Sequence, residues 1–172
     1  MTKPGSLLLA AEGESKPSFD VSLSPRWWGG VSLLRTFTGA FFAPFSDSPG
    51  LTSKVELAVH ELLENAIKYA CSLDSPVRCR GKIAGDRIML QVENRALEAN
   101  IKTLRDEFRL VLAGDPLEVY LRMMERSLFN GDKSQLGLAR VRYEADAALQ
   151  LRVVKNRVTI QATFEWPARQ GG

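Results

Sequence analysis

Glu61, Asn65 and Lys68 are the residues whose types and spacing point most clearly to chemistry. They lie three or four positions apart, so their side chains share one face of a predicted helix. A carboxylate beside an amide can pair a general base with a ligand for Mg²⁺, which prefers oxygen donors and keeps several waters. The spacing alone favours a simpler interpretation, a solvated stripe on which Glu64 and Lys68 form an ion pair.

The three residues belong to the strongest helix signal in the chain, residues 51–70. Ser53 followed by Glu56 predicts a capping box at the helix start. Lys54 and Ala58 extend the polar stripe of Glu61, Asn65 and Lys68. The opposite arc of the helix is apolar and predicts the buried face: Val55, Val59, Leu62, Leu63, Ala66, Ile67 and Ala70.

The scarcity of histidine and cysteine excludes several other kinds of site. His60 is the only histidine, and Cys71 and Cys79 form no recognised ligand spacing. A zinc-protease helix would need a second histidine, and a Ser-His-Asp or Cys-His site would have to use His60. Two unpaired thiols fit a reducing cytoplasm, so we expect a cytoplasmic protein.

Length and charge indicate one globular domain. Of the 172 residues, 45% are hydrophobic and 25% charged, and no apolar run reaches the roughly 18–20 residues of a membrane span. The net charge of +3 is too small to indicate nucleic acid. We expect a flexible N-terminal tail over 1–17, a single domain over 18–166 and a C-terminal tail over 167–172.

The remaining patterns predict an α+β fold, a two-layer sandwich of a mixed or antiparallel sheet with helices on one face. A strand is expected at 18–23, with hairpins at 77–94 and 149–164. Helices are expected at 26–43, 97–112, 136–145 and after a cap at Asp115. The outward cations of the first hairpin lack interleaved aromatics, which favours a solvated face: Arg78, Arg80, Lys82 and Arg87.

The segment from His60 to Ala70 resembles the asparagine box of the GHKL, or Bergerat-fold, ATPase and kinase superfamily. Gly137 and Leu138 resemble the end of that superfamily's second glycine box. The layout from Phe19 to Phe164 is similar to SiaB-like regulators and to the anti-sigma-factor serine/threonine kinases of bacterial partner switching. The sequence departs from the superfamily in lacking the first glycine box and in having Gln135 at the first lid glycine.

The resemblance implies a Bergerat ATP-binding fold with ATP and Mg²⁺ as cofactors. It implies Glu61 as the catalytic base and Asn65 as the Mg²⁺ ligand. It also implies a protein serine/threonine kinase that phosphorylates a small regulatory partner of the anti-anti-sigma kind, with a homodimer and neither membrane nor nucleic acid as partner. The residues that it implies for nucleotide binding are Asn65, Lys68, Asn94, Gly131, Lys133, Ser134, Gly137 and Leu138.

Two alternatives remain beside the kinase. The missing glycines are typical of a degenerate GHKL module that binds a partner without phosphotransfer, because a side chain at Gln135 keeps the backbone away from phosphate. A complete sensor histidine kinase is disfavoured, because the first 50 residues hold no sensor or membrane segment. His60 is then a packing residue rather than a phospho-acceptor.

Overall fold

The computed structural model describes residues 16–45, 48–130 and 136–165. The two expected tails, apart from residues 16 and 17, and the lid residues Gly131, Lys133 and Ser134 lie outside the described residues. The elements are β1 (Ser18–Leu23), α1 (Gly30–Phe42), a 3-10 turn (Ala43–Phe45), α2 (Pro49–Lys68), β2 (Val77–Ala84), β3 (Arg87–Arg95), α3 (Glu98–Leu112), α4 (Pro116–Asn130), α5 (Leu136–Tyr143), β4 (Ala148–Val154) and β5 (Arg157–Glu165).

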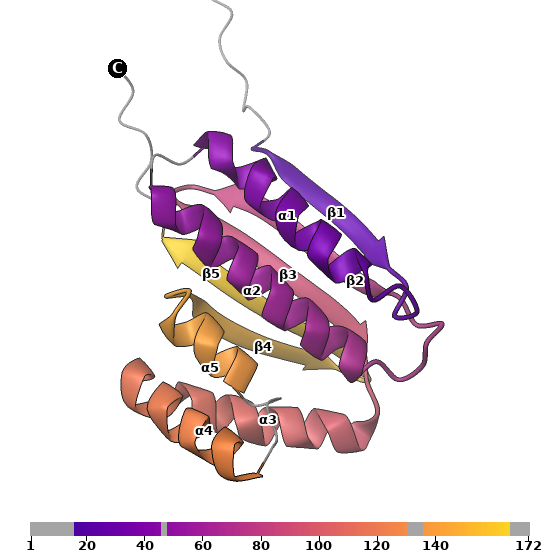
Figure 1. The fold of residues 1–172 in the computed structure, drawn as a ribbon. Helices are drawn as coiled ribbons and strands as arrows, with labels where there is room; N and C mark the ends of the chain where they lie inside the picture. Colours follow the sequence, from indigo (N-terminus) through magenta and orange to yellow (C-terminus); the bar gives the residue numbers. More distant parts are fainter. Residues whose placement is uncertain (1–15, 46–47, 131–135, 166–172) are drawn as a thin grey trace, which may run out of the picture.

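The five strands form one sheet in the order β1-β2-β3-β5-β4, and every neighbouring pair is antiparallel. Helices α1, α2 and α5 cover one face of this sheet, while α3 and α4 lie beside the β4 edge (Figure 1). The two-layer α+β fold is therefore confirmed, with an antiparallel rather than mixed sheet. The two expected hairpins and the first strand are confirmed as well.

Alternating residues of the central strands separate a covered face from an open face. On β3, Ile88, Leu90 and Val92 are buried beneath α2, while Gln91 and Glu93 point to the opposite side. Since the side-chain period of a strand is two residues, this alternation places the core between the sheet and the helices. The buried face of α2 follows the predicted apolar arc from Val55 to Ile67.

The start of α2 differs from the prediction. The helix begins at Pro49 with Ser48 as its N-cap, so Ser53 and Glu56 lie inside it and form no capping box. Proline suits the first helical position because its missing N–H would have no intrahelical partner there. Glu56 instead packs on α1, where a Cβ at Gly39 would overlap its carboxylate.

The starts of two other helices can be compared with the sequence signals that predicted them. The helix predicted from residue 26 begins only at Gly30, and Trp27 and Trp28 before it are exposed. The cap at Asp115 is confirmed, because its Oδ1 accepts hydrogen bonds from the N–H groups of Leu117 (3.0 Å) and Glu118 (3.1 Å).

Both thiols are free, as the sequence predicts. Burial raises the pKa of the Cys79 thiol to about 12, so this side chain packs as an unreactive apolar group. Among the described residues, no helix has the length and apolar character needed to cross a membrane.

Candidate functional site

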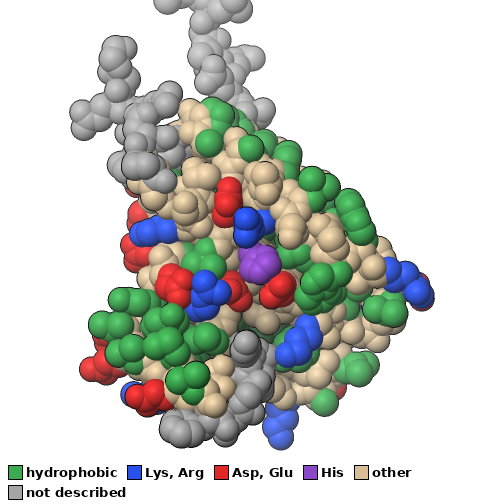
Figure 2. All heavy atoms as spheres, viewed as in Figure 1, with side chains coloured by type: hydrophobic (Ala, Val, Ile, Leu, Met, Phe, Trp, Pro, Cys, Tyr) green, Lys and Arg blue, Asp and Glu red, His purple; other side chains and the backbone are tan. Residues whose placement is uncertain are grey.

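Charged side chains gather on the helical face of the molecule around its single histidine. In Figure 2 the imidazole of His60 lies among acidic and basic side chains. His60 Nε2 lies 3.3 Å from Glu64 Oε1, one helical turn away, so Glu64 pairs with His60 and the predicted Glu64–Lys68 pair is wrong. The polar stripe of α2 thus leads into a cluster of charges where α5 packs against it.

Arg140 of α5 connects this cluster to Glu61. One guanidinium nitrogen, Nη1, makes a close ion pair with Glu61 Oε1. Its Nε and Nη2 atoms donate to the two carboxylate oxygens of Glu144 at 3.1 and 3.2 Å. Arg140 and, after it, the Tyr120 side chain of α4 hold the pKa of the Glu144 carboxyl below its usual range, and the Tyr120 ring stacks on Tyr143 at a centroid distance of 5.1 Å. Four side chains, Glu61, Tyr120, Arg140 and Glu144, therefore form one network.

The Glu61 carboxylate is held in an unusual environment. Its side chain is only 13% exposed, and burial raises its pKa above the ordinary glutamate value, while the Arg140 guanidinium partly opposes that rise. A carboxylate with a raised pKa is a stronger base, and an adjacent cation keeps it ionised. This combination suits a general base once its oxygen is free to accept a proton.

Gly137 lets α5 approach the site closely. A Cβ at this position would lie 2.6 Å from Glu61 Oε2 and 3.5 Å from Asn65 Nδ2. Any side chain there would displace the Glu61 carboxylate or push the start of α5 outward. The glycine that the resemblance assigns to phosphate binding therefore also has a packing role here, against Glu61.

Asn65 and Asn94 line one small cavity between α2, α3 and the covered face of the sheet. Asn94 is 6% exposed, as expected from its inward position at the end of β3, and its Nδ2 makes a 3.4 Å contact with the carbonyl of Arg95. From α3, Thr103 and Glu107 reach the same cavity. Polar groups from segments far apart in sequence thus converge.

The cavity has a volume of only about 30 Å³. That is the volume of about one water molecule, whereas ligand pockets occupy roughly 300–1,000 Å³. Helix α3 forms the wall of the cavity opposite α2 and packs against α4, α5 and β4. A nucleotide base would therefore need α3 to move away from α2.

The other predicted site residues lie in different surroundings. Lys68 is exposed, with its Nζ 5.2 Å from the Tyr69 ring centroid. Leu138 is buried in the core, and Ala58, which the sequence placed on a solvated stripe, is fully buried. The middle of the polar stripe is covered because a second helix, α5, packs on that side of α2, with Gly137 against Glu61 and Asn65. Gly131, Lys133 and Ser134 lie outside the described residues.

Arg140, Glu144 and Tyr120 are site residues that sequence reasoning missed. The spacing of Arg140 and Glu144 was an available signal, because residues four apart face each other on a helix. No local pattern, however, indicates that Arg140 also reaches Glu61, which lies 79 positions away in sequence.

The side chains of this site could bind Mg²⁺ only if other ligands, such as phosphates, shared the ion with them. The described residues contain no cluster of three or more histidine, cysteine or acidic side chains able to hold a metal ion. The Asn65 amide oxygen is one suitable donor, and Mg²⁺ in phosphate sites typically takes one or two protein oxygens beside phosphates and waters. Glu61 is already engaged by Arg140. Asn65 would hold Mg²⁺ together with the phosphates of a nucleotide.

Comparison with solved structures finds this fold in a chain of the SiaB–SiaC complex from Pseudomonas aeruginosa. The superposition has a TM-score of 0.62 and covers 86% of this chain and 88% of that chain, at 13% sequence identity. No protein-family model and no curated protein matches the sequence. At this identity the likeness shows the fold, and the fold agrees with the SiaB-like layout that the sequence predicts.

Proposed function

We propose that this chain is a partner-switching regulator that binds ATP with Mg²⁺ and phosphorylates a serine or threonine hydroxyl of a small protein partner. Glu61 is the general base, Asn65 the Mg²⁺ ligand and Asn94 the group that accepts a hydrogen bond from the adenine amine. Lys68, with Gly131, Lys133, Ser134, Gly137 and Leu138, belongs to the proposed phosphate side of the site.

One observation carries the proposal. Asn65 from α2 and Asn94 from β3 line the same cavity, and Gly137 of α5 lies against Asn65 and the neighbouring Glu61. Three segments that the sequence relates to one superfamily thus meet in space, although they lie far apart along the chain. The shared fold with a chain of the SiaB–SiaC complex supports the partner-switching part of the proposal.

These groups account for each bond and proton in the proposed phosphoryl transfer. Glu61 accepts the proton of the acceptor hydroxyl, the hydroxyl oxygen forms a bond to the γ-phosphorus, and the bond from that phosphorus to the ADP oxygen breaks. Mg²⁺ supplies charge neutralisation on the phosphates. Before this step the ion pair between Arg140 and Glu61 must break. The triphosphate competes for Arg140, because its several charged oxygens attract a guanidinium more strongly than one carboxylate does.

A phosphotransfer assay on a whole cell extract tests the proposal for every partner that the extract contains. The purified chain is incubated with γ-labelled ATP, Mg²⁺ and a soluble extract of its own cells. We expect a small protein to become labelled on serine or threonine. Glu61→Gln should remove the labelling while leaving ATP binding within about threefold of wild type. Glu64→Gln, one turn further along α2, is the matched control and should retain it.

The closed cavity favours one second candidate, a regulator that binds its partner without phosphotransfer. The volume of about 30 Å³ and the Arg140–Glu61 ion pair together leave no room for a nucleotide in this arrangement. The absence of any ATP binding, combined with capture of a partner, would favour this candidate and contradict the kinase.

We also propose that two copies associate through the N-terminal strand and helix. β1 is an edge strand, and the surface between β1 and α1 exposes Trp27 (53%), Leu33 (60%) and Phe37 (41%). Exposed apolar clusters of this kind are typical of interfaces. Light scattering should give the mass of a dimer, and Leu33→Asp should give the mass of a monomer.

A further inference from the structure

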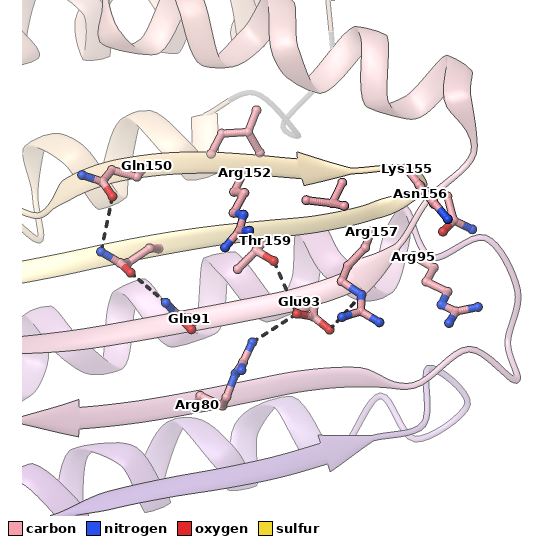
Figure 3. A pocket seen from close by; sticks show the side chains of 13 residues that line it. Arg80, Gln91, Glu93, Arg95, Gln150, Arg152, Lys155, Asn156, Arg157 and Thr159 are labelled. Carbon is pink, nitrogen blue, oxygen red and sulfur yellow. Dashed lines mark hydrogen bonds and ion pairs between the residues drawn. The ribbon is translucent and has the colours of Figure 1, made fainter.

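A large cavity lies on the open face of the sheet, opposite the helices (Figure 3). Its volume is about 940 Å³, at the upper end of the range for ligand pockets. It crosses four strands, from Arg80 on β2 to Arg152 on β4, and it ends at the β4–β5 turn around Lys155 (Figure 3). We refer to it as the basic groove.

The basic groove concentrates unbalanced positive charge. Five cationic side chains line it, and a single carboxylate, Glu93, opposes them, which gives a net charge of +4. That exceeds the net charge of +3 for the whole chain. The cations that line the groove are Arg80, Arg95, Arg152, Lys155 and Arg157.

Some cations elsewhere on the same face are paired, although Lys82 has no ion pair or hydrogen bond with another described residue. Arg78 donates two hydrogen bonds to Asp20, and Arg87 lies 3.1 Å from Glu165. In the groove, by contrast, the side chains of Arg95, Arg152 and Lys155 make no ion pair or hydrogen bond with another residue of the described ranges. On the face that the sequence predicts to be solvated, the groove therefore gathers three cations without a partner among the described residues.

Glu93 lies at the centre of the groove and leaves positive charge uncompensated there too. Its carboxylate is 3.1 Å from Arg80 and 3.6 Å from Arg157, so two guanidinium groups share one carboxylate (Figure 3). The Arg80 Nε atom is buried and has no hydrogen-bond partner among the described residues. An additional carboxylate in the groove would balance the charge that Glu93 leaves on the two guanidinium groups, although the buried Arg80 Nε atom lies out of its reach.

One of the unpaired cations, Lys155, lies at a strained position of the backbone. Lys155 has φ of 56°, a left-handed conformation that side chains other than those of glycine and asparagine rarely adopt. Glycine would be more stable at this turn, since the left-handed region costs other residues about 1–2 kcal/mol. A strained residue that adds charge to the groove is consistent with a binding role for that charge.

We propose that the basic groove binds an acidic, extended segment of a partner protein. Carboxylates along such a segment complement Arg95, Arg152 and Lys155. Gln91 Nε2 already donates a hydrogen bond to Gln161 Oε1 at 2.8 Å, which leaves Gln91 Oε1 to accept a hydrogen bond from the backbone of the segment. A nucleic acid fits less well, because no aromatic side chain lines the groove for base stacking. The proposal does not rest on the proposed kinase activity.

A labelled poly-glutamate peptide tests the groove, with binding followed by fluorescence anisotropy at two salt concentrations. The groove variant carries Arg95→Gln, Arg152→Gln and Lys155→Gln. The control carries Lys102→Gln, Arg122→Gln and Arg126→Gln, which remove the same charge from exposed positions on α3 and α4. We expect the groove variant to bind at least about tenfold more weakly and the control to stay within about twofold of wild type.

A single change separates binding from folding. Lys155→Gly relieves the strained turn, so it should weaken peptide binding by about twofold or more while leaving the melting temperature unchanged or raised. Equal weakening by the control variant, or no saturable binding to wild type at low salt, would overturn the proposal. So would tighter binding of an oligo-dT strand than of the peptide at the same salt, which would indicate a nucleic-acid surface.

Discussion

Charged side chains are paired beneath and between the helices on one side of the sheet, and several are unpaired on the other side. On the covered face, Glu61, Arg140 and Glu144 form a paired network near a cavity of about 30 Å³. On the open face, a cavity of about 940 Å³ is lined by Arg95 and Arg152, which have no partner among the described residues. The same five strands support both.

The difference follows from the cost of burial. A charge without a partner beneath the helices would lose its hydration, so the ionic groups of Glu61 and Arg140 are paired. At the open face water solvates each side chain, and the fold itself does not require pairing. Pairing on the covered face therefore reports on stability and positioning, whereas the unpaired cations of the open face are the basis of the binding proposed for the groove.

Two neighbouring residues of β3 should show the largest difference in stability between the two faces of the sheet. Leu90 is fully buried under α2, and Gln91 lies on the open face. We expect Leu90→Ala to lower the free energy of unfolding by about 2–5 kcal/mol and Gln91→Ala to lower it by less than about 1 kcal/mol. Urea denaturation followed by circular dichroism measures both. Similar losses would mean that the open face is covered in solution.

Breaking the charge network of the covered face should lower the free energy of unfolding by a smaller amount, and the loss should depend on whether Glu61 is still charged. Arg140→Gln leaves the Glu61 carboxylate without its cation and should cost about 1–2 kcal/mol, below the value for a fully buried pair because Arg140 is 35% exposed. Adding Glu61→Gln should recover part of that loss. If the two losses simply add in a double-mutant cycle, the ion pair is absent in solution.

The raised pKa of Glu61 predicts a pH dependence of stability. Because the folded state holds this proton more tightly than the unfolded state, stability falls as the pH rises above 4.5 through the raised value. Glu61→Gln should remove this part of the fall, so its stability relative to wild type should rise over the same window. Melting curves across mildly acidic to neutral pH provide the measurement. A relative stability that is flat or declining would contradict the assigned shift.

The smallest effect is expected at the turn of the open face. Lys155→Gly should stabilise the fold by about 0.5–1 kcal/mol, because glycine adopts the left-handed conformation without strain but loses more backbone entropy on folding. Asn156→Gly, at the neighbouring turn position, serves as the comparison and should give no gain. Destabilisation by Lys155→Gly would show that the turn is not strained.

Periodic signals predicted much of this molecule. Alternation defined the strand from Ser18 to Leu23 and both hairpins, and it placed Asn94 on the covered face, where it is buried. The helical arc of residues 51–70 identified the buried face of α2, and the motif on it brought Glu61 and Asn65 into the candidate site. The strands and the buried faces depend on local periodicity, which a single sequence carries, whereas the motif was identified by its resemblance to a superfamily.

Features that depend on contacts between distant elements were not accessible in the same way. Ala58 was assigned to a solvated stripe because nothing local shows that α5 covers that side of α2. The Arg140–Glu61 pair and the wall that α3 forms over Asn65 arise from packing of the same kind. Ser53 and Glu56 matched a capping box by letters, but Pro49 starts the helix a turn earlier.

The central claim is that the covered face opens to hold a nucleotide at Asn65 and Asn94. A calorimetric titration of ATP with Mg²⁺ into wild type and Asn65→Ala tests it most directly, with melting curves to verify that both are folded. We predict saturable binding to wild type and at least about tenfold weaker binding to Asn65→Ala. No heat and no thermal shift at millimolar ATP, or equal binding by the two proteins, would contradict the claim.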